Sequence, residues 1–239
     1  DVLLSEDGKK QLSQIKEDMV FPPVQALFTS PLKRCKETAA ILYPENKPIE
    51  IEGFIEYNFG EFENKTAEQL EKYEEFPKWL AGEKGVKPPY GESNEEFAKR
   101  VCETFEKVAE GLMKTGTTSA SIITHGGVIM TILAAFGIPE YPMHEWLTPN
   151  GCGFTVKVNP SLWMRAKKFE VFSEFPYERE ELENGDIREV LKLKLLYRLI
   201  AGILLSLTSK KNFLISTSCS IALFISSLAI PFFLNSSKT

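Results

Sequence analysis

Two predicted strands are each followed closely by a residue whose side chain could bind a phosphoryl group. Arg34 lies about one turn into a predicted helix that follows a buried strand and Ser30-Pro31. A guanidinium at this position can bind two phosphate oxygens with parallel hydrogen bonds. His125 ends another predicted strand, and Gly126-Gly127 open the helix after it. Free amide groups and the helix dipole at such a terminus favour an anion.

Glu56 is the third candidate, because the residues that follow it can keep water away from its carboxyl group. Tyr57, Phe59 and Gly60 follow it closely in the sequence, and partial desolvation raises the pKa of a carboxyl toward that of a useful general acid. Phosphoryl transfer through an enzyme-bound intermediate needs a nucleophile, cations around the transferred oxygens and an acid for the leaving oxygen. The three residues fit the last two roles.

The elements that must position these residues alternate between strand and helix. Strands are predicted from apolar or alternating runs at 24–29, 49–52, 119–124, 152–158 and 169–173. Helices are predicted from periodicity and end signals at 5–19, 31–42, 66–80 with a break or kink at Pro77, 93–114 and 128–136. Ser93 and Glu96 match a capping box. The pattern predicts an α/β three-layer sandwich with a mainly parallel sheet.

Composition limits the function classes. The chain has 239 residues, of which 43% are hydrophobic and 26% charged, enough for one α/β domain that we place at 1–180. The four cysteines form no C-x-x-C pair and there are only two histidines, so we expect no metal site, no cofactor and reduced thiols, as in a cytoplasmic protein. The 1–180 domain has no stripe of basic residues with interleaved aromatic residues, which argues against nucleic-acid binding.

The C-terminal part, 191–239, is an apolar tail with six basic and no acidic residues. Its 212–234 stretch has no charged residue and is long enough to cross a bilayer core of about 30 Å. Lys210 and Lys211 precede this stretch, and the positive-inside tendency would keep the acidic body in the cytoplasm. We predict a membrane anchor; the alternative is that the reading frame has run into unrelated or frame-shifted sequence.

Five ordered segments resemble the histidine phosphatase superfamily, which has the phosphoglycerate-mutase-like fold. They are LSEDGKKQ, TSPLKRCKETA, IEYNFGEFE, GESNEEFAKRV and ITHGGVI, and they cover about residues 1–158. Arg34 or Glu56 alone would be interpreted as a solvated surface charge, but their order and spacing favour the site. The resemblance implies that Arg34 and His125 bind phosphate, with Gly126 beside them, and that Glu56 is the acid.

One part of the family pattern has no match. The family's first strand ends in an Arg-His-Gly motif that carries the nucleophile, and that segment would lie before Asp1. Since the chain also lacks an initiator Met, we expect an N-terminally truncated domain that lacks its first strand and does not form a phosphohistidine. His144 matches no catalytic motif, so we interpret it as structural.

The resemblance leaves three functions open. The first is a phosphatase that hydrolyses a small phosphorylated metabolite through a phosphohistidine in the intact relative, without a metal. The second is a phosphoglycerate mutase, although the span from Glu56 to Glu92 leaves little room for the insertions that mutases carry. The third is a pseudoenzyme that binds a phosphate ligand without turnover. Neither the substrate nor the oligomeric state follows from the sequence.

Overall fold

The computed structural model describes residues 1–181, 187–190 and 219–225. A seven-stranded sheet has the strand order β3-β2-β4-β10-β6-β7-β5. Its strands are β2 Ala26–Thr29, β3 Ile49–Glu50, β4 Ser119–Thr124, β5 Gly137–Ile138, β6 Gly153–Val158, β7 Phe169–Phe175 and β10 Cys219–Ile225. A smaller antiparallel sheet contains β1 Met19–Val20, β8 Tyr177–Glu181 and β9 Ile187–Val190.

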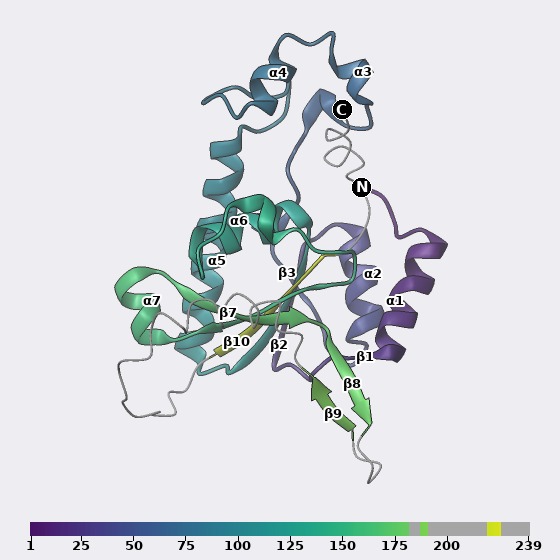
Figure 1. Cartoon of the computed structure of the whole chain (residues 1–239), viewed down its shortest axis with the longest axis vertical. Helices are drawn as coiled ribbons and strands as arrows, with labels where there is room; N and C mark the ends of the chain where they lie inside the picture. Colours follow the sequence, from purple (N-terminus) through teal and green to yellow (C-terminus); the bar gives the residue numbers. More distant parts are fainter. Residues whose placement is uncertain (182–186, 191–218, 226–239) are drawn as a thin grey trace, which may run out of the picture.

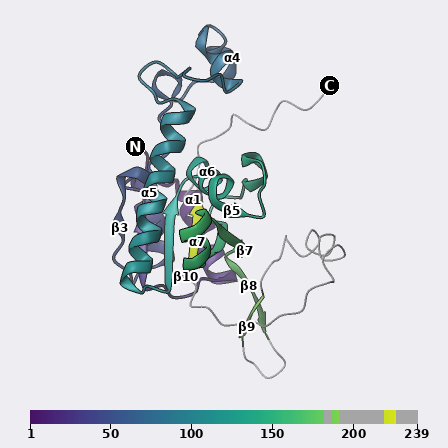
Figure 2. The ribbon, with the colours of Figure 1, turned by 90° about the vertical axis from the view of Figure 1, so that its left-hand side faces the viewer.

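Helices cover both faces of the large sheet, so the predicted α/β class is confirmed (Figures 1 and 2). α1 and α2 lie on one face, and α5, α6 and α7 on the other. Their bounds are α1 Glu6–Asp18, α2 Lys33–Leu42, α5 Asn94–Thr115, α6 Gly126–Phe136 and α7 Pro160–Ala166. The parallel pairs β2·β3, β2·β4 and β4·β10 bring the carboxyl ends of these strands to one edge, whereas β6 runs antiparallel to both its neighbours.

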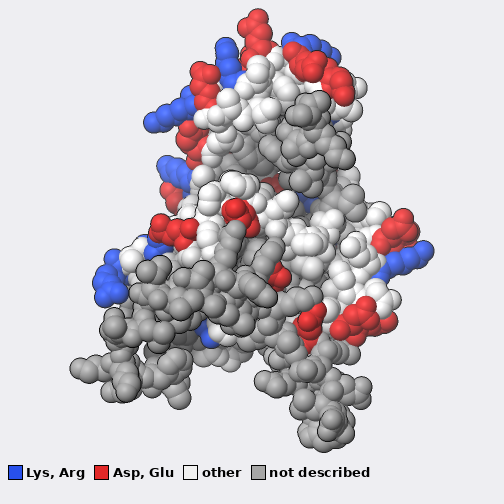
Figure 3. All heavy atoms as spheres, viewed as in Figure 1, with Lys and Arg blue, Asp and Glu red and all other residues white. Residues whose placement is uncertain are grey.

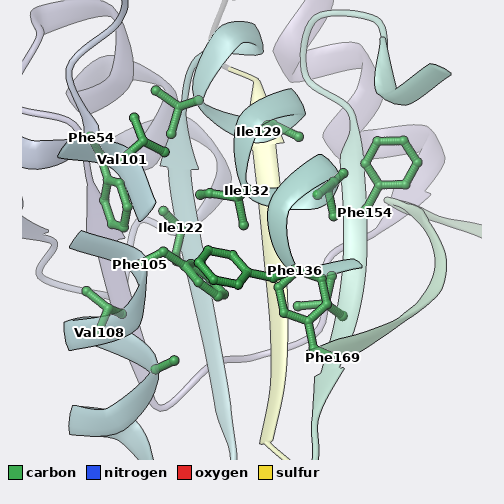
Figure 4. Close-up of a cluster of buried hydrophobic side chains, with 14 of the residues drawn as sticks. Phe54, Val101, Phe105, Val108, Ile122, Ile129, Ile132, Phe136, Phe154 and Phe169 are labelled. Carbon is green, nitrogen blue, oxygen red and sulfur yellow. The ribbon is translucent and has the colours of Figure 1, made fainter. Parts of the chain in front are cut away.

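Two hydrophobic clusters hold the layers together. The larger one packs α5, α6 and α7 against the sheet, and its centre contains Phe105, Phe136 and Phe169 together with Ile122 of β4 (Figure 4). The smaller cluster packs α2 against the opposite face, where Ile123 of β4 is fully buried. Because successive side chains of a strand point to opposite faces, β4 contributes to both clusters. Burial on both faces agrees with the small and apolar residues of this strand, SASIIT.

Capping residues fix several helix ends as the sequence predicts. Ser5 accepts a hydrogen bond from the amide of Gly8 at the start of α1. Ser93 and Glu96 form a reciprocal capping box at the start of α5, and Gly116, at φ 68°, ends that helix in the left-handed conformation that glycine tolerates.

Helical structure between 66 and 80 differs from the expectation. It is divided into α3 Ala67–Leu70 and α4 Glu75–Leu80, so the break precedes Pro77. Pro77 lies in the first turn of α4, where its missing amide has no intrahelical partner to lose. These two helices project beyond the edge of the sheet (Figure 1). Trp79 of α4 packs on Tyr57 and Phe59 at ring-centroid distances of 5.9 Å each.

The shorter β3 is a second difference. The alternating 49–52 stretch forms a strand only at 49–50, and a 3-10 helix, η1 Glu52–Phe54, follows. Phe54 is fully buried in the larger cluster, which turns the chain away from the sheet edge and toward the Glu56 segment.

The apolar tail contributes a strand to the centre of the large sheet. β10 lies between β4 and β6, with Ser220 opposite Ser119 and Ile225 opposite Thr124. Residues 219–225 belong to the stretch that we expected to span a membrane, and they form a strand instead of part of a helix. The described residues include no helix that is long and apolar enough to cross a bilayer. The remainder of 191–239 lies outside the described residues.

Candidate functional site

His125 and Arg34 meet at the edge where β2 and β4 end. β2 and β4 are parallel neighbours with Thr29 opposite Ile123, so Ser30 and His125 leave adjacent strands at nearly the same level. Arg34 is in the first turn of α2, directly after β2. Its Nη2 lies 3.1 Å from Nδ1 of His125. A guanidinium and an imidazole from two separate segments are therefore in contact.

The hydrogen bonds of His125 assign its tautomer. A guanidinium can only donate, so Nδ1 accepts from Arg34 and the ring proton resides on Nε2. Nε2 lies 2.8 Å from Oγ of Ser30, to which it donates. The Sγ atom of Cys35 is 3.4 Å from the same nitrogen. His125 therefore presents a neutral ring that is held on both nitrogens.

Burial keeps His125 uncharged. The residue is only 2% exposed, and desolvation lowers its pKa to about 3, with further lowering by the positive charges of Arg34 and Arg100. An imidazole with this pKa is neutral at physiological pH. The positive charge near this ring thus comes from arginine.

Arg34 has a buried donor without a hydrogen-bond acceptor among the described residues. Its Nε atom is buried and makes no hydrogen bond to the part of the chain that the structure describes. An unsatisfied buried donor is costly, and such a group in a native structure calls for an explanation. A bound anion would supply the missing acceptor, and a guanidinium suits phosphate in particular.

Glu56 faces the start of α6. Its Oε1 accepts a hydrogen bond from the amide of Tyr57 at 2.8 Å, and its Oε2 accepts one from the amide of Gly127 at 3.2 Å. The side chain of His125, the N-cap residue, makes no capping bond, so Glu56 satisfies one of the donors at this helix end. A Cβ atom on Gly127 would lie 2.5 Å from Oε1 of Glu56. A side chain at position 127 would therefore force the Glu56 carboxyl to move away from the start of α6.

The surroundings of Glu56 favour its protonated form. Burial raises the pKa of its carboxyl group, whereas the two amide bonds and the charges of Arg34 and Arg100 oppose this rise. The direction agrees with the sequence-based expectation for a general acid. It also means that a buried carboxyl, a neutral imidazole and an arginine share one edge of the sheet.

Arg100 is a residue that the sequence reasoning did not select. It lies on α5, two helical turns after Glu92, and its Nη2 is 2.7 Å from Oε1 of Glu92. The available signal was the spacing of an acid and a base, eight residues apart in GESNEEFAKR. The capping-box match at Ser93 and Glu96 predicts only the start of a helix at this place.

The other sequence-predicted positions have simple locations. Gly126 is the first residue of α6. His144 is exposed in the 3-10 helix η3 Met143–Trp146. Among the described residues, no group of three or more His, Cys, Asp or Glu side chains could hold a metal ion. Acidic and basic side chains are interspersed on the visible surface near α3 and α4 (Figure 3).

A family model described as the histidine phosphatase superfamily (branch 1) matches residues 1–165. Among solved structures, the α-ribazole phosphatase from Shigella flexneri is similar, with a TM-score of 0.59 and 20% identity over 71% of this chain and 82% of that one. Phosphoserine phosphatase from Entamoeba histolytica, solved with 3-phosphoglyceric acid, has a TM-score of 0.50 and 25% identity over 63% and 76% of the two chains. A comparison with curated proteins finds no match.

Proposed function

The chain belongs to the histidine phosphatase superfamily (branch 1), and we propose that its site binds the phosphoryl group of a small phosphorylated metabolite for phosphomonoester hydrolysis. The main observation behind this proposal is that the buried Nε donor of Arg34, beside His125, has no acceptor in the part of the chain that the structure describes. Phosphate oxygens are the acceptors that a guanidinium fork fits best. The solved phosphatases with a similar fold support this ligand class.

Arg34, His125 and Glu56 have different roles in the proposal. Arg34 binds two phosphoryl oxygens. His125 carries its ring proton on Nε2, so a phosphoryl oxygen that replaces Ser30 as acceptor receives a hydrogen bond from a neutral donor. When a histidine nitrogen attacks phosphorus and the bond from phosphorus to the leaving oxygen breaks, Glu56 gives its proton to that oxygen. Glu56 then takes a proton from the water whose oxygen bonds to phosphorus as the bond from phosphorus to that histidine breaks.

The nucleophile is the part of the reaction that these residues do not supply. The 239 residues contain two histidines. His125 has both ring nitrogens in hydrogen bonds, and His144 is exposed in η3. The resemblance assigns the attacking histidine to a segment before Asp1. We therefore propose that these 239 residues bind phosphate without forming a phosphohistidine themselves.

Calorimetry with inorganic phosphate tests the binding site. We expect Arg34→Ala to weaken phosphate binding by about 10-fold to 100-fold, because a hydrogen bond to a charged group contributes roughly 1.5–3 kcal/mol. Lys33→Ala is the matched control, since Lys33 is the preceding residue and is exposed; its affinity should stay within about threefold. Equal affinities of the wild type and Arg34→Ala would reject the site.

An assay of inorganic phosphate release from p-nitrophenyl phosphate tests the chemistry. For these 239 residues we expect binding without release, because no nucleophilic histidine is in place. Release that persists unchanged in both Arg34→Ala and His125→Ala would contradict the proposed roles of these residues.

A further inference from the structure

Arg100 connects helix α5 to the segment that carries Glu56. Its Nη1 donates to the carbonyl oxygens of Gly53 and Ile55, both at 2.9 Å. Its Nη2 and Nε donate to the two carboxylate oxygens of Glu92 at 2.7 and 3.3 Å. The guanidinium also lies over the ring of Phe97, 5.2 Å from its centroid. One side chain thus contacts the backbone immediately before Glu56 and an acid from another segment.

Glu92 completes the connection on the other side of Glu56. Its Oε1 accepts a hydrogen bond from the amide of Asn58 at 2.8 Å, and its own amide donates to the carbonyl of Asn58 at 3.0 Å. The hydroxyl of Tyr57 donates to the carbonyl oxygen of Glu92 at 2.6 Å. The Arg100–Glu92 pair therefore contacts the chain both before and after Glu56.

The segment around Glu56 needs such contacts because it lacks regular structure. Residues 55–59 belong to no helix or strand, and loop backbone is fixed only by the bonds that it makes. Meanwhile the Glu56 carboxyl must stay within hydrogen-bonding distance of the Gly127 amide, 71 residues further along the chain. The planar guanidinium of Arg100 binds two carbonyls and both oxygens of one carboxylate, whereas an ammonium has only three donors and no fixed fork geometry.

We propose that Arg100 and Glu92 are positioning residues that hold the carboxyl group of Glu56 against the start of α6. This inference rests on the proposed function, in which Glu56 exchanges the proton with the leaving oxygen and water. A merely structural pair would add to stability and leave the relation between Glu56 and Gly127 unchanged. The two interpretations therefore predict different responses of the Gly127 amide signal to the ionisation of Glu56.

Nuclear magnetic resonance of the ¹⁵N-labelled full chain measures this relation directly. As the pH changes, the amide signal of Gly127 should move with the ionisation of Glu56, and Glu56→Gln should abolish that movement. Arg100→Lys keeps the positive charge but loses the planar guanidinium. In this variant we expect the pH-dependent shift of the Gly127 amide signal to be smaller by about twofold or more. Binding of inorganic phosphate should stay within about threefold, since Arg34 and His125 are untouched.

The control and a second variant keep the test decisive. Lys99→Arg makes the reverse exchange at the preceding, exposed position and should titrate like the wild type. If Arg100→Lys fails to fold, Glu92→Gln, which keeps an acceptor for Asn58, should show a smaller loss in the same direction. An unchanged Gly127 titration in a folded variant of either kind overturns the inference. Failure of the wild type to bind phosphate would instead overturn the proposed function, while the amide titration would still decide the positioning role.

Discussion

Two ionisable side chains at this site, His125 and Glu56, are held in their uncharged forms more strongly than they would be in water. Burial lowers the pKa of His125 to about 3 and raises the pKa of Glu56. Over part of the pH range, folding therefore holds these two groups in protonation states that the unfolded chain does not favour. Each group makes stability depend on pH in its own direction.

The first prediction concerns His125, which should destabilise the folded protein as the solution becomes acidic. An unfolded histidine has a pKa near 6.5, whereas His125 has a pKa of about 3 in the folded protein. Between these values the unfolded chain binds more protons, so stability is complete above pH 6.5 and falls as the pH drops toward 3. From pH 7 to pH 5 the loss that His125 causes should be about 2 kcal/mol.

Urea unfolding at both pH values measures this loss. His125→Asn should remove it, because asparagine can accept a hydrogen bond from Arg34 but does not titrate. His144→Asn is the matched control, since His144 is the other histidine of the chain and is exposed; it should keep the full loss. The same pH dependence in wild type and His125→Asn would contradict the prediction.

The second prediction concerns Glu56, for which the sign is opposite. A carboxyl whose pKa is raised by folding holds its proton more tightly in the folded state, so its ionisation lowers stability as the pH rises through the folded pKa. Glu56→Gln should therefore stabilise the protein at pH 7 by about 1 kcal/mol, as is common when a functional group is replaced. The corresponding rise in melting temperature is about 2–4 °C for a chain of this size.

Calorimetric melting at pH 7 and pH 4 tests the assignment to ionisation. The gain of Glu56→Gln should shrink at pH 4, where the wild-type carboxyl also carries its proton. Glu63→Gln is the control, because Glu63 is exposed on the same loop and should change the melting temperature by less than about 1 °C. A destabilised Glu56→Gln at pH 7 would show that the two amide bonds outweigh the desolvation.

At the scale of elements, short-range signals predicted the site segments and missed the central strand. The Ser-Pro boundary before Arg34, the Ser93 capping box and the Gly-Gly pair after His125 are local signals, and the structure has a helix start near each. The sequence did not indicate a role for Arg100, because its contacts with the Glu56 segment join residues that are 45 and 47 positions apart. The pairing of β10 with β4 is more distant still, and periodicity carries no information about which strands become neighbours.

The expectation for 212–234 shows the same limit. An uncharged apolar run suits a membrane span, but it also suits a strand that is buried on both faces. Sequence length favoured the first interpretation, whereas the described part of this stretch, 219–225, lies between β4 and β6. Whether this stretch forms a strand depends on a place being open between β4 and β6, and only the arrangement of the whole sheet determines that.

The third prediction tests the placement of β10 by cross-linking. Cys219 lies opposite Val158 in the antiparallel pair of β10 and β6, and opposite residues of such a pair have Cβ atoms about 4.5–5.5 Å apart. Val158→Cys should therefore form a disulfide with Cys219 within one chain under mild oxidation. In Lys157→Cys, the adjacent position, the side chain points to the other face of the sheet.

Peptide mapping by mass spectrometry identifies the cross-linked residues. We expect at least about fivefold more 158–219 disulfide in Val158→Cys than 157–219 disulfide in Lys157→Cys. A 158–219 bond that occurs only between two chains would mean that the strand comes from a second copy. Equal yields for the two variants would contradict the register.

At the scale of the whole molecule, the large sheet lies between two hydrophobic clusters and contributes residues to both. Ile122 and Ile123 are adjacent in β4, are both fully buried, and belong to different clusters. α5 and α6 reach the sheet through the larger cluster and α2 through the smaller one. The site lies where α2 and α6 begin, so its geometry depends on both layers.

The fourth prediction follows from this shared sheet. Phe105→Ala in α5 should cost about 3–5 kcal/mol and Leu42→Ala in α2 about 2–5 kcal/mol, because each removes a buried side chain and leaves a cavity. If the clusters unfold together, each variant shows a single unfolding transition with a shifted midpoint. Near-ultraviolet and far-ultraviolet circular dichroism then give the same midpoint urea concentration. Tyr90→Ala, at a position that is 87% exposed, should leave the midpoint nearly unchanged. If Leu42→Ala separated the two signals while Phe105→Ala did not, α2 and its half of the candidate site would unfold independently of α6. Arg34 and His125 would then be brought together by docking of two units, and phosphate should restore the single transition.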